Sequence, residues 1–230
     1  CRRHAERVMG SLEQLAYGCV RRRDDVHGGG GGGAGNVNLT INLDGRKRDR
    51  PLRDQDFVAL APHLFGAVKE AVRGERYGRA SSSGDGGVQA VLDVHAEHNA
   101  CADAGTIALC DTLIALRQHN IAAVRALFLW KNEVGDEGAR GIARLISATA
   151  VRGFERMWVA EVHLSHNSIS AAGAVSIFDA AQASQYPRPY VGGGLAPIWL
   201  RLEHNAINMN ALIRHMPPHC RAERRGDRAH

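Results

Sequence analysis

A chain of 230 residues can form one large domain or two small ones, and an apolar content of 44% is typical of globular proteins. No apolar run approaches the ~20 residues that a membrane-spanning helix needs, which argues against a membrane protein. The formal net charge of +5 lies mainly in the two ends of the chain. Residues 1–23 hold six arginines against two glutamates, and residues 214–230 hold five arginines against Glu223 and Asp227.

The first segment, residues 1–27, is basic and is expected to contain an amphipathic helix that caps the exposed first edge of the fold. Apolar residues recur there at helical spacing: Val8, Leu12, Leu15, Ala16 and Cys19. Residues 28–36 are a glycine-rich linker, which lacks the lysine and hydroxyl of a phosphate-binding loop. Because the chain begins at Cys1 and shows no signal-peptide core, we interpret it as a fragment or a processed product.

Residues 37–72 are expected to form one degenerate strand–helix unit. Val37, Leu39, Ile41 and Leu43 alternate as in a strand, and a helical pattern starts near Asp54. The segment "GRKRDRP" lies between them as an insertion, so the register of this unit with later ones stays open. Residues 73–87 are expected to form a flexible connector.

Four later segments share the pattern apolar-x-x-apolar-x-apolar-x-x-Asn-x-apolar. They are "VLDVHAEHNAC" (91–101), "VRALFLWKNEV" (124–134), "VAEVHLSHNSI" (159–169) and "PIWLRLEHNAI" (197–207). Asn99, Asn132, Asn167 and Asn205 occupy one position at spacings of 33, 35 and 38. Asp103, Asp136 and Ser170 then precede helical patterns and are expected to cap these helices. One unit is therefore a short strand, an asparagine turn and a helix.

This pattern resembles the leucine-rich repeat family of the ribonuclease-inhibitor-like type, over residues 88–213. Similar repeats occur in NLR receptors and Ran GTPase-activating proteins. The resemblance implies an α/β solenoid: an open horseshoe segment with parallel strands on the concave side and helices on the convex side. It would contain four clear repeats and one degenerate repeat. It also implies that the four asparagines form a structural ladder of amide bonds to the backbone of adjacent turns.

Function in repeat arrays usually lies on the strand surface. Three columns of side chains should face it: Asp93, Ala126, Glu161 and Trp199; His95, Phe128, His163 and Arg201; Glu97, Trp130, Ser165 and Glu203. Exposed aromatic residues there are candidate anchors for a protein partner, unless loops such as residues 186–195 cover them. We therefore predict a partner-binding set on the concave face: Phe128, Trp130, Glu161, His163, Trp199, Arg201 and Glu203.

The row before the asparagines contains His98, Lys131, His166 and His204, which raises the hypothesis of a metal site. A flat strand surface splays its side chains, and Lys131 would repel a cation, so solvated histidines without metal or cofactor are the preferred interpretation. Five cysteines, odd in number and without a C-x-x-C pair, favour a reducing intracellular compartment, cytoplasmic or nuclear. Cys101 and Cys110 stand at apolar positions and are expected to be buried thiols.

No nucleophile–base pattern indicates an enzyme. The leading interpretation is a non-catalytic module that binds an unidentified protein on its concave strand face, with no membrane contact. One alternative is a regulatory or GTPase-activating role on a bound partner. Another is nucleic-acid binding through the arginine-rich tails, of which residues 214–230 are expected to be a disordered basic tail.

Overall fold

The computed structural model describes residues 2–23, 37–76, 90–148, 158–189 and 194–215. The predicted glycine-rich linker, residues 28–36, and the part of the predicted connector after residue 76 lie outside the described residues. Residues 216–230 of the predicted tail lie outside them as well.

The described residues form one six-stranded sheet in the order β1-β2-β3-β4-β5-β8. Its strands are β1 (Val20–Arg22), β2 (Val37–Asn42), β3 (Ala90–His95), β4 (Ala122–Phe128), β5 (Glu161–His163) and β8 (Trp199–Arg201). β1 pairs antiparallel with β2, and all later neighbours pair in parallel. A separate small ribbon joins β6 (Arg188–Pro189) and β7 (Leu195–Ala196). The predicted α/β class with parallel strands is confirmed.

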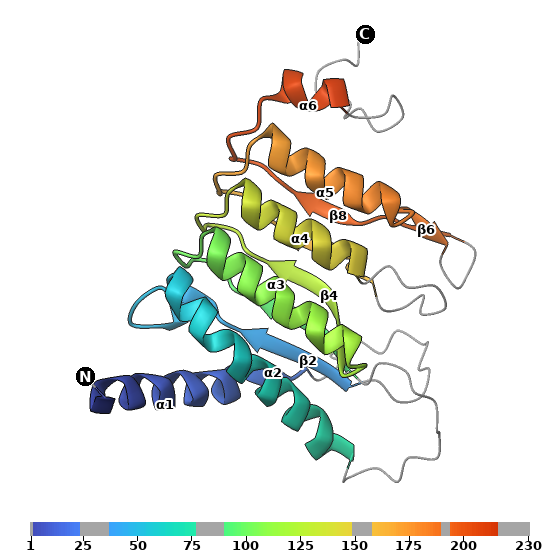
Figure 1. Cartoon of the computed structure of the whole chain (residues 1–230). Helices are drawn as coiled ribbons and strands as arrows, with labels where there is room; N and C mark the ends of the chain where they lie inside the picture. Colours follow the sequence, from blue (N-terminus) through green and yellow to red (C-terminus); the bar gives the residue numbers. More distant parts are fainter. Residues whose placement is uncertain (1, 24–36, 77–89, 149–157, 190–193, 216–230) are drawn as a thin grey trace.

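Helices connect the parallel strands and lie side by side on one face of the sheet in chain order (Figure 1). They are α2 (Asp54–Arg76), α3 (Asp103–Gln118), α4 (Asp136–Ala148) and α5 (Ala171–Ala183), followed by a short α6 (Met209–His215) that contacts α5. α1 (Arg2–Cys19) packs against α2 at the first edge. We call the sheet face opposite to α2–α5 the strand face.

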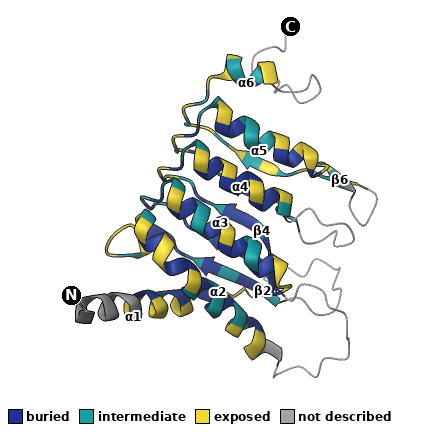
Figure 2. Cartoon of the chain, viewed as in Figure 1, coloured by how far each residue is buried: buried dark blue, intermediate teal, exposed yellow. Residues whose placement is uncertain are grey.

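The core lies between the helices and the sheet. Figure 2 shows exposed residues on the outer side of α2–α5 and buried ones toward the strands. Alternate strand residues such as Leu92, Val94, Leu127 and Val162 have 0% exposure, because parallel strands covered by helices bury their inner face. Burial weakens in the last unit, where Ile198, Leu200, Leu202 and Ile207 are only partly buried.

The described cysteines belong to this core. Cys19, Cys101 and Cys110 are free and buried. Burial raises the pKa of Cys19 to about 11 and that of Cys101 to about 12. These thiols are therefore protonated near neutral pH, in line with the expectation for Cys101 and Cys110.

The alignment of the first two repeats was off by one residue at the strand start. The sequence pattern places Val91 opposite Val124, but the structure pairs Leu92 with Val124 and Asp93 with Ala126. Arg125 is therefore an extra, bulged residue of β4, which a pattern of apolar positions does not reveal. The bulge directs the Arg125 side chain to Asp93, which also pairs with Arg23.

The register of the degenerate first unit follows from its backbone bonds. Gly45 N–H donates to Glu97 O at 2.9 Å, as His98 N–H donates to Trp130 O at 3.1 Å in the next turn. Gly45 thus corresponds to His98, and a Cβ on it would collide with the backbone carbonyl of His98. Arg46 consequently stands at the position that Asn99 holds in the following unit.

Two expected boundaries were wrong, and one segment holds an element that the sequence did not predict. The N-terminal segment contains β1 in addition to its helix, and this three-residue strand closes the first edge of the sheet. Residues 73–76 continue α2 instead of starting the connector, because the arginines and glutamate there are good helix formers. Arg214 and His215 belong to α6 and not to a disordered tail.

Candidate functional site

Four asparagine amides hold the turns that follow the strands. Asn132 Oδ1 accepts from Cys101 N–H at 3.1 Å, and Asn132 Nδ2 donates to Ala96 O at 2.9 Å and to Leu129 O at 3.0 Å. Asn99, Asn167 and Asn205 make the corresponding bonds with their own preceding turns. Each amide therefore satisfies backbone groups of two successive units and fixes the strand ends in line.

The residue before each asparagine has a left-handed backbone. The φ angles of His98, Lys131, His166 and His204 are 56°, 54°, 58° and 57°. Such angles are uncommon for residues other than glycine, although asparagine, aspartate and histidine adopt them more often than most, so three of these four residues suit the turn. His166 and His204 stack with ring centroids 4.2 Å apart. Within the described residues no group of three histidine, cysteine, aspartate or glutamate side chains is arranged to hold a metal ion.

Carboxylates bridge the starts of successive helices. Asp54 accepts from the N–H groups of Ala102 and Gly105 at 2.6 and 2.8 Å, although it lies in α2 and they lie at the start of α3. Asp136 likewise accepts from Ser170 N–H and Oγ at 2.8 and 2.7 Å. The expectation that Asp103 and Asp136 cap their own helices was wrong, because each caps the next helix. Ser170 does cap its own helix, accepting from Ala172 N–H at 3.1 Å.

The strand register aligns the predicted site residues. Phe128, His163 and Arg201 are neighbours on β4, β5 and β8, and Glu161 neighbours Trp199. Trp130 and Glu203 follow two residues after the ends of β4 and β8. The predicted set therefore shares one face, with Trp199, Arg201 and Glu203 exposed and Phe128, Trp130, Glu161 and His163 half-buried.

Three residues of this set, Phe128, Trp130 and His163, have their rings in contact. His95 and His98, which are outside the set, contact these rings as well. His95 stacks on Phe128 at 4.6 Å, and Trp130 stacks on His163 at 5.6 Å. His98 meets Trp130 edge-on at 4.1 Å, and Phe128 and His163 are 6.5 Å apart. We call these five residues the aromatic cluster. Such offset and edge contacts fix the rings in one arrangement.

Trp199 lies apart from the aromatic cluster. It stands on the last strand beside Glu161 and is 64% exposed. The loop of residues 186–195 was considered as a cover for the aromatic residues, but its first described residues contact other parts of the molecule. Tyr186 OH donates to Val159 O at 2.7 Å, and the Arg188 guanidinium lies 4.5 Å from the centre of the Trp158 ring. Trp199 is consequently accessible, whereas Arg201 pairs with Glu203 at 3.6 Å.

Two residues near the cluster were missed as site residues. Glu97 lies in the third column, but its side chain is only 7% exposed. Its Oε1 lies 3.3 Å from His95 Nδ1 and 3.9 Å from the Arg46 guanidinium. Arg46 also lies 5.6 Å from the centre of the Trp130 ring. The column pattern could have indicated Glu97, but the open register of the first unit hid Arg46.

Two histidines of the cluster are held in their neutral form. Burial, and then the Arg201 charge, lowers the pKa of His163 below its ordinary value. Burial, and then Arg46 and Lys131, lowers the pKa of His98. His163 Nε2 lies 2.7 Å from Ser165 Oγ, a hydrogen bond that orients the ring. These two rings therefore contribute no charge to the cluster at neutral pH.

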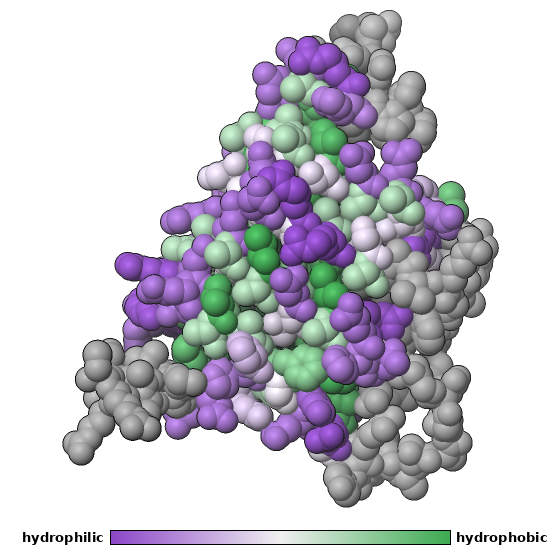
Figure 3. All heavy atoms as spheres, viewed as in Figure 1, coloured by the Kyte–Doolittle hydropathy of each residue, from purple (hydrophilic) through white to green (hydrophobic). Residues whose placement is uncertain are grey.

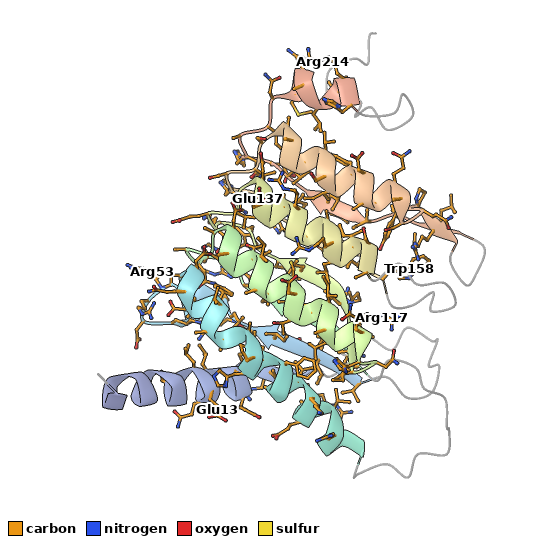
Figure 4. The ribbon with its side chains drawn as sticks, in the orientation of Figure 1. Glu13, Arg53, Arg117, Glu137, Trp158 and Arg214 are labelled. Atoms are coloured by element: carbon orange, nitrogen blue, oxygen red, sulfur yellow. The ribbon has the colours of Figure 1, made fainter. Side chains whose placement is uncertain are left out.

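The helix side of the molecule carries polar and apolar side chains together. Figure 3 shows hydrophilic side chains scattered among apolar ones over the helices. Figure 4 places Arg53 and Glu137 at the starts of α2 and α4 on this side. None of the described helices is both long enough and apolar enough to span a membrane.

No protein-family model matches the chain, and no curated protein sequence matches it.

Proposed function

We propose that the chain is a leucine-rich-repeat protein of the ribonuclease-inhibitor-like type and acts as a non-catalytic protein-binding module through its strand face. The asparagine bonds and the strand–turn–helix units in register support the family assignment. The buried free thiols Cys19, Cys101 and Cys110 support an intracellular location.

The aromatic cluster carries the functional proposal. Trp130 and Phe128 are large side chains held half-exposed on a face that the helices leave open. Aromatic residues in such positions dominate the binding energy of protein interfaces. Their contacts with His95, His98 and His163 fix the rings before binding, which reduces the entropy lost on association.

Paired capture tests this proposal. The immobilised chain, its Trp130→Ala variant and a Val58→Ala control are exposed to extract from the native source, at 50 and 200 mM salt. Val58 is an exposed apolar residue of α2, on the helix side, so its loss should not matter. We expect one partner to bind the wild type and the Val58→Ala variant at both salt concentrations, and to be lost with Trp130→Ala. Capture that survives Trp130→Ala but disappears at 200 mM salt would favour the basic tails.

A further inference from the structure

One carboxylate oxygen of Glu97 is buried without a hydrogen-bond partner among the described residues. Its side chain is 7% exposed, and within the described residues Oε2 is buried with no hydrogen-bond partner. Leaving a buried carboxylate oxygen unpaired costs free energy, so such an atom calls for an explanation. The side chain belongs to the strand face, and its Oε1 lies 3.3 Å from Nδ1 of His95, a member of the aromatic cluster.

The neighbours of Glu97 are suited to a cation. Glu97 and Trp130 stand on adjacent turns, joined where His98 N–H donates to Trp130 O. The indole ring already has two cations of the protein near it, the Arg46 guanidinium at 5.6 Å and the Lys131 ammonium at 5.3 Å from its centre. An aromatic face beside a buried carboxylate attracts a cation through both cation–π and charge-assisted contacts.

Arg46 covers this place without satisfying Glu97. Its guanidinium is bonded to Asp44, with Nη2 2.9 Å from Oδ2 and Nε 3.2 Å from both oxygens. It remains 3.9 Å from Glu97 Oε1, too far for a hydrogen bond. The Arg46 side chain is 55% exposed, so it can turn toward solvent, giving up its bonds to Asp44 when it does so.

We propose that Glu97 and Trp130 form a subsite for an arginine side chain of the partner, and that Arg46 occupies the entrance in the free protein. This rests on the proposed function, because it assumes that the partner lies on the strand face. An arginine fits better than a lysine, because a planar guanidinium can stack on the indole and donate to both carboxylate oxygens at once. Arg46 moves aside when that side chain enters.

The test uses the full chain and N-acetylarginine N-methylamide as the probe. Binding is followed by the NMR signal of the Trp130 indole N–H, assigned with a Trp130→Phe variant. The matched control probe is the citrulline analogue, which has nearly the same shape and no charge. We expect the arginine probe to shift the Trp130 signal and the citrulline probe to leave it in place. Equal shifts with both probes would overturn the proposal.

Two variants sharpen the test. Arg46→Ala should bind the arginine probe several-fold more tightly than the wild type, because the competing side chain is gone. Adding Glu97→Gln to Arg46→Ala should remove that gain. Unchanged or weaker binding by Arg46→Ala would overturn the proposal even if the Glu97→Gln variant does not fold.

Partner capture and probe binding test the proposed binding face and the proposed subsite independently. If partner capture depends on Trp130 but the arginine probe does not bind, the subsite is wrong and the protein-binding face stands. If the probe binds as expected but capture does not depend on Trp130, Glu97 and Trp130 do bind a guanidinium group, but the proposed function is wrong and a protein partner does not supply that group.

Discussion

The carboxylate of Asp103, in the first turn of α3, accepts a hydrogen bond from the backbone N–H of Gly138 at the start of α4, at 2.8 Å. The same oxygen accepts from Gly135 N–H at 2.7 Å. Gly138 is required here, because a Cβ at this position would lie 2.8 Å from that oxygen. A negative charge at a helix N-terminus is also favourable to the helix dipole, so Asp103 stabilises two helices at once.

Asp103→Ala should lower the free energy of unfolding by about 1–2 kcal/mol, the usual cost of losing a helix cap. The N–H groups of Gly135 and Gly138 lose their acceptor in this variant. Urea unfolding followed by circular dichroism measures the change. Asp111→Ala is the control, because Asp111 is exposed on the same helix and, among the described residues, forms its ion pair with exposed Arg144, which is worth under about 1 kcal/mol. Equal losses in both variants would show that the cap contributes no more than a surface ion pair.

Asn132→Ala should lower the free energy of unfolding by ~1–3 kcal/mol, because buried backbone groups of two turns lose their partner. Asn132 is 9% exposed and lies between two complete units. Asn205→Ala should cost less, since Asn205 is only partly buried and belongs to the last described turn. The two melting curves decide this, and a larger loss for Asn205→Ala contradicts the importance of burial.

Once a partner is in hand, Trp130→Ala should weaken its affinity by about 2 kcal/mol or more. Deleting residues 216–230, which leaves α6 intact, should change the affinity much less. Calorimetric titration of both variants, each checked for its fold, compares the two. A tail deletion that abolishes binding while Trp130→Ala retains it would refute the strand face as the site.

The free energy of unfolding should fall as the pH is lowered below neutrality, in part through His163. Its pKa is lowered in the folded protein and returns to about 6.5 in the unfolded chain. Between these two values the unfolded state binds more protons, so stability rises with pH there and is lost as pH falls. His98 acts in the same direction.

Urea unfolding from pH 7.5 to 5.0 tests this. The double variant His98→Gln, His163→Gln should show a flatter pH dependence than the wild type, and each single variant should lie between them. A steeper dependence in the double variant would mean that the two histidines gain protons on folding.

The strands and the turns could be predicted from the sequence, because each is marked by a pattern of neighbouring residues. Alternating apolar residues mark β2, and the recurring asparagines mark the residues whose amides bond to the preceding turn. The Arg125 bulge escaped notice because an extra residue in a strand leaves the downstream pattern unchanged. Asp103 was assigned to the wrong helix because both helix starts require the same acceptor, and only the stacking of units decides which one receives it.

The site was less accessible to prediction. Phe128, Trp130 and His163 share a face by strand alternation alone, and that placement needs no tertiary information. Arg46 reaches the same place from a unit whose register an insertion conceals. The exposure of Trp199 and the burial of Glu97 depend on which neighbours the last and first units provide, and the spacing of residues along the chain does not contain that information.

The two kinds of bridge point in opposite directions along the stack. Asparagines reach back to the preceding unit, and aspartates reach forward to the next helix. Residues 103–135 contain one complete set of both, so a tandem duplication of this stretch would present each new junction with the acceptors and donors it needs. The first unit, with Arg46 for asparagine, and the unit of α5, with Ala171 where the earlier helices have aspartate, cannot be copied in this way. We therefore expect whole units to be added more readily in the middle of the stack than at the first unit or at the unit of α5.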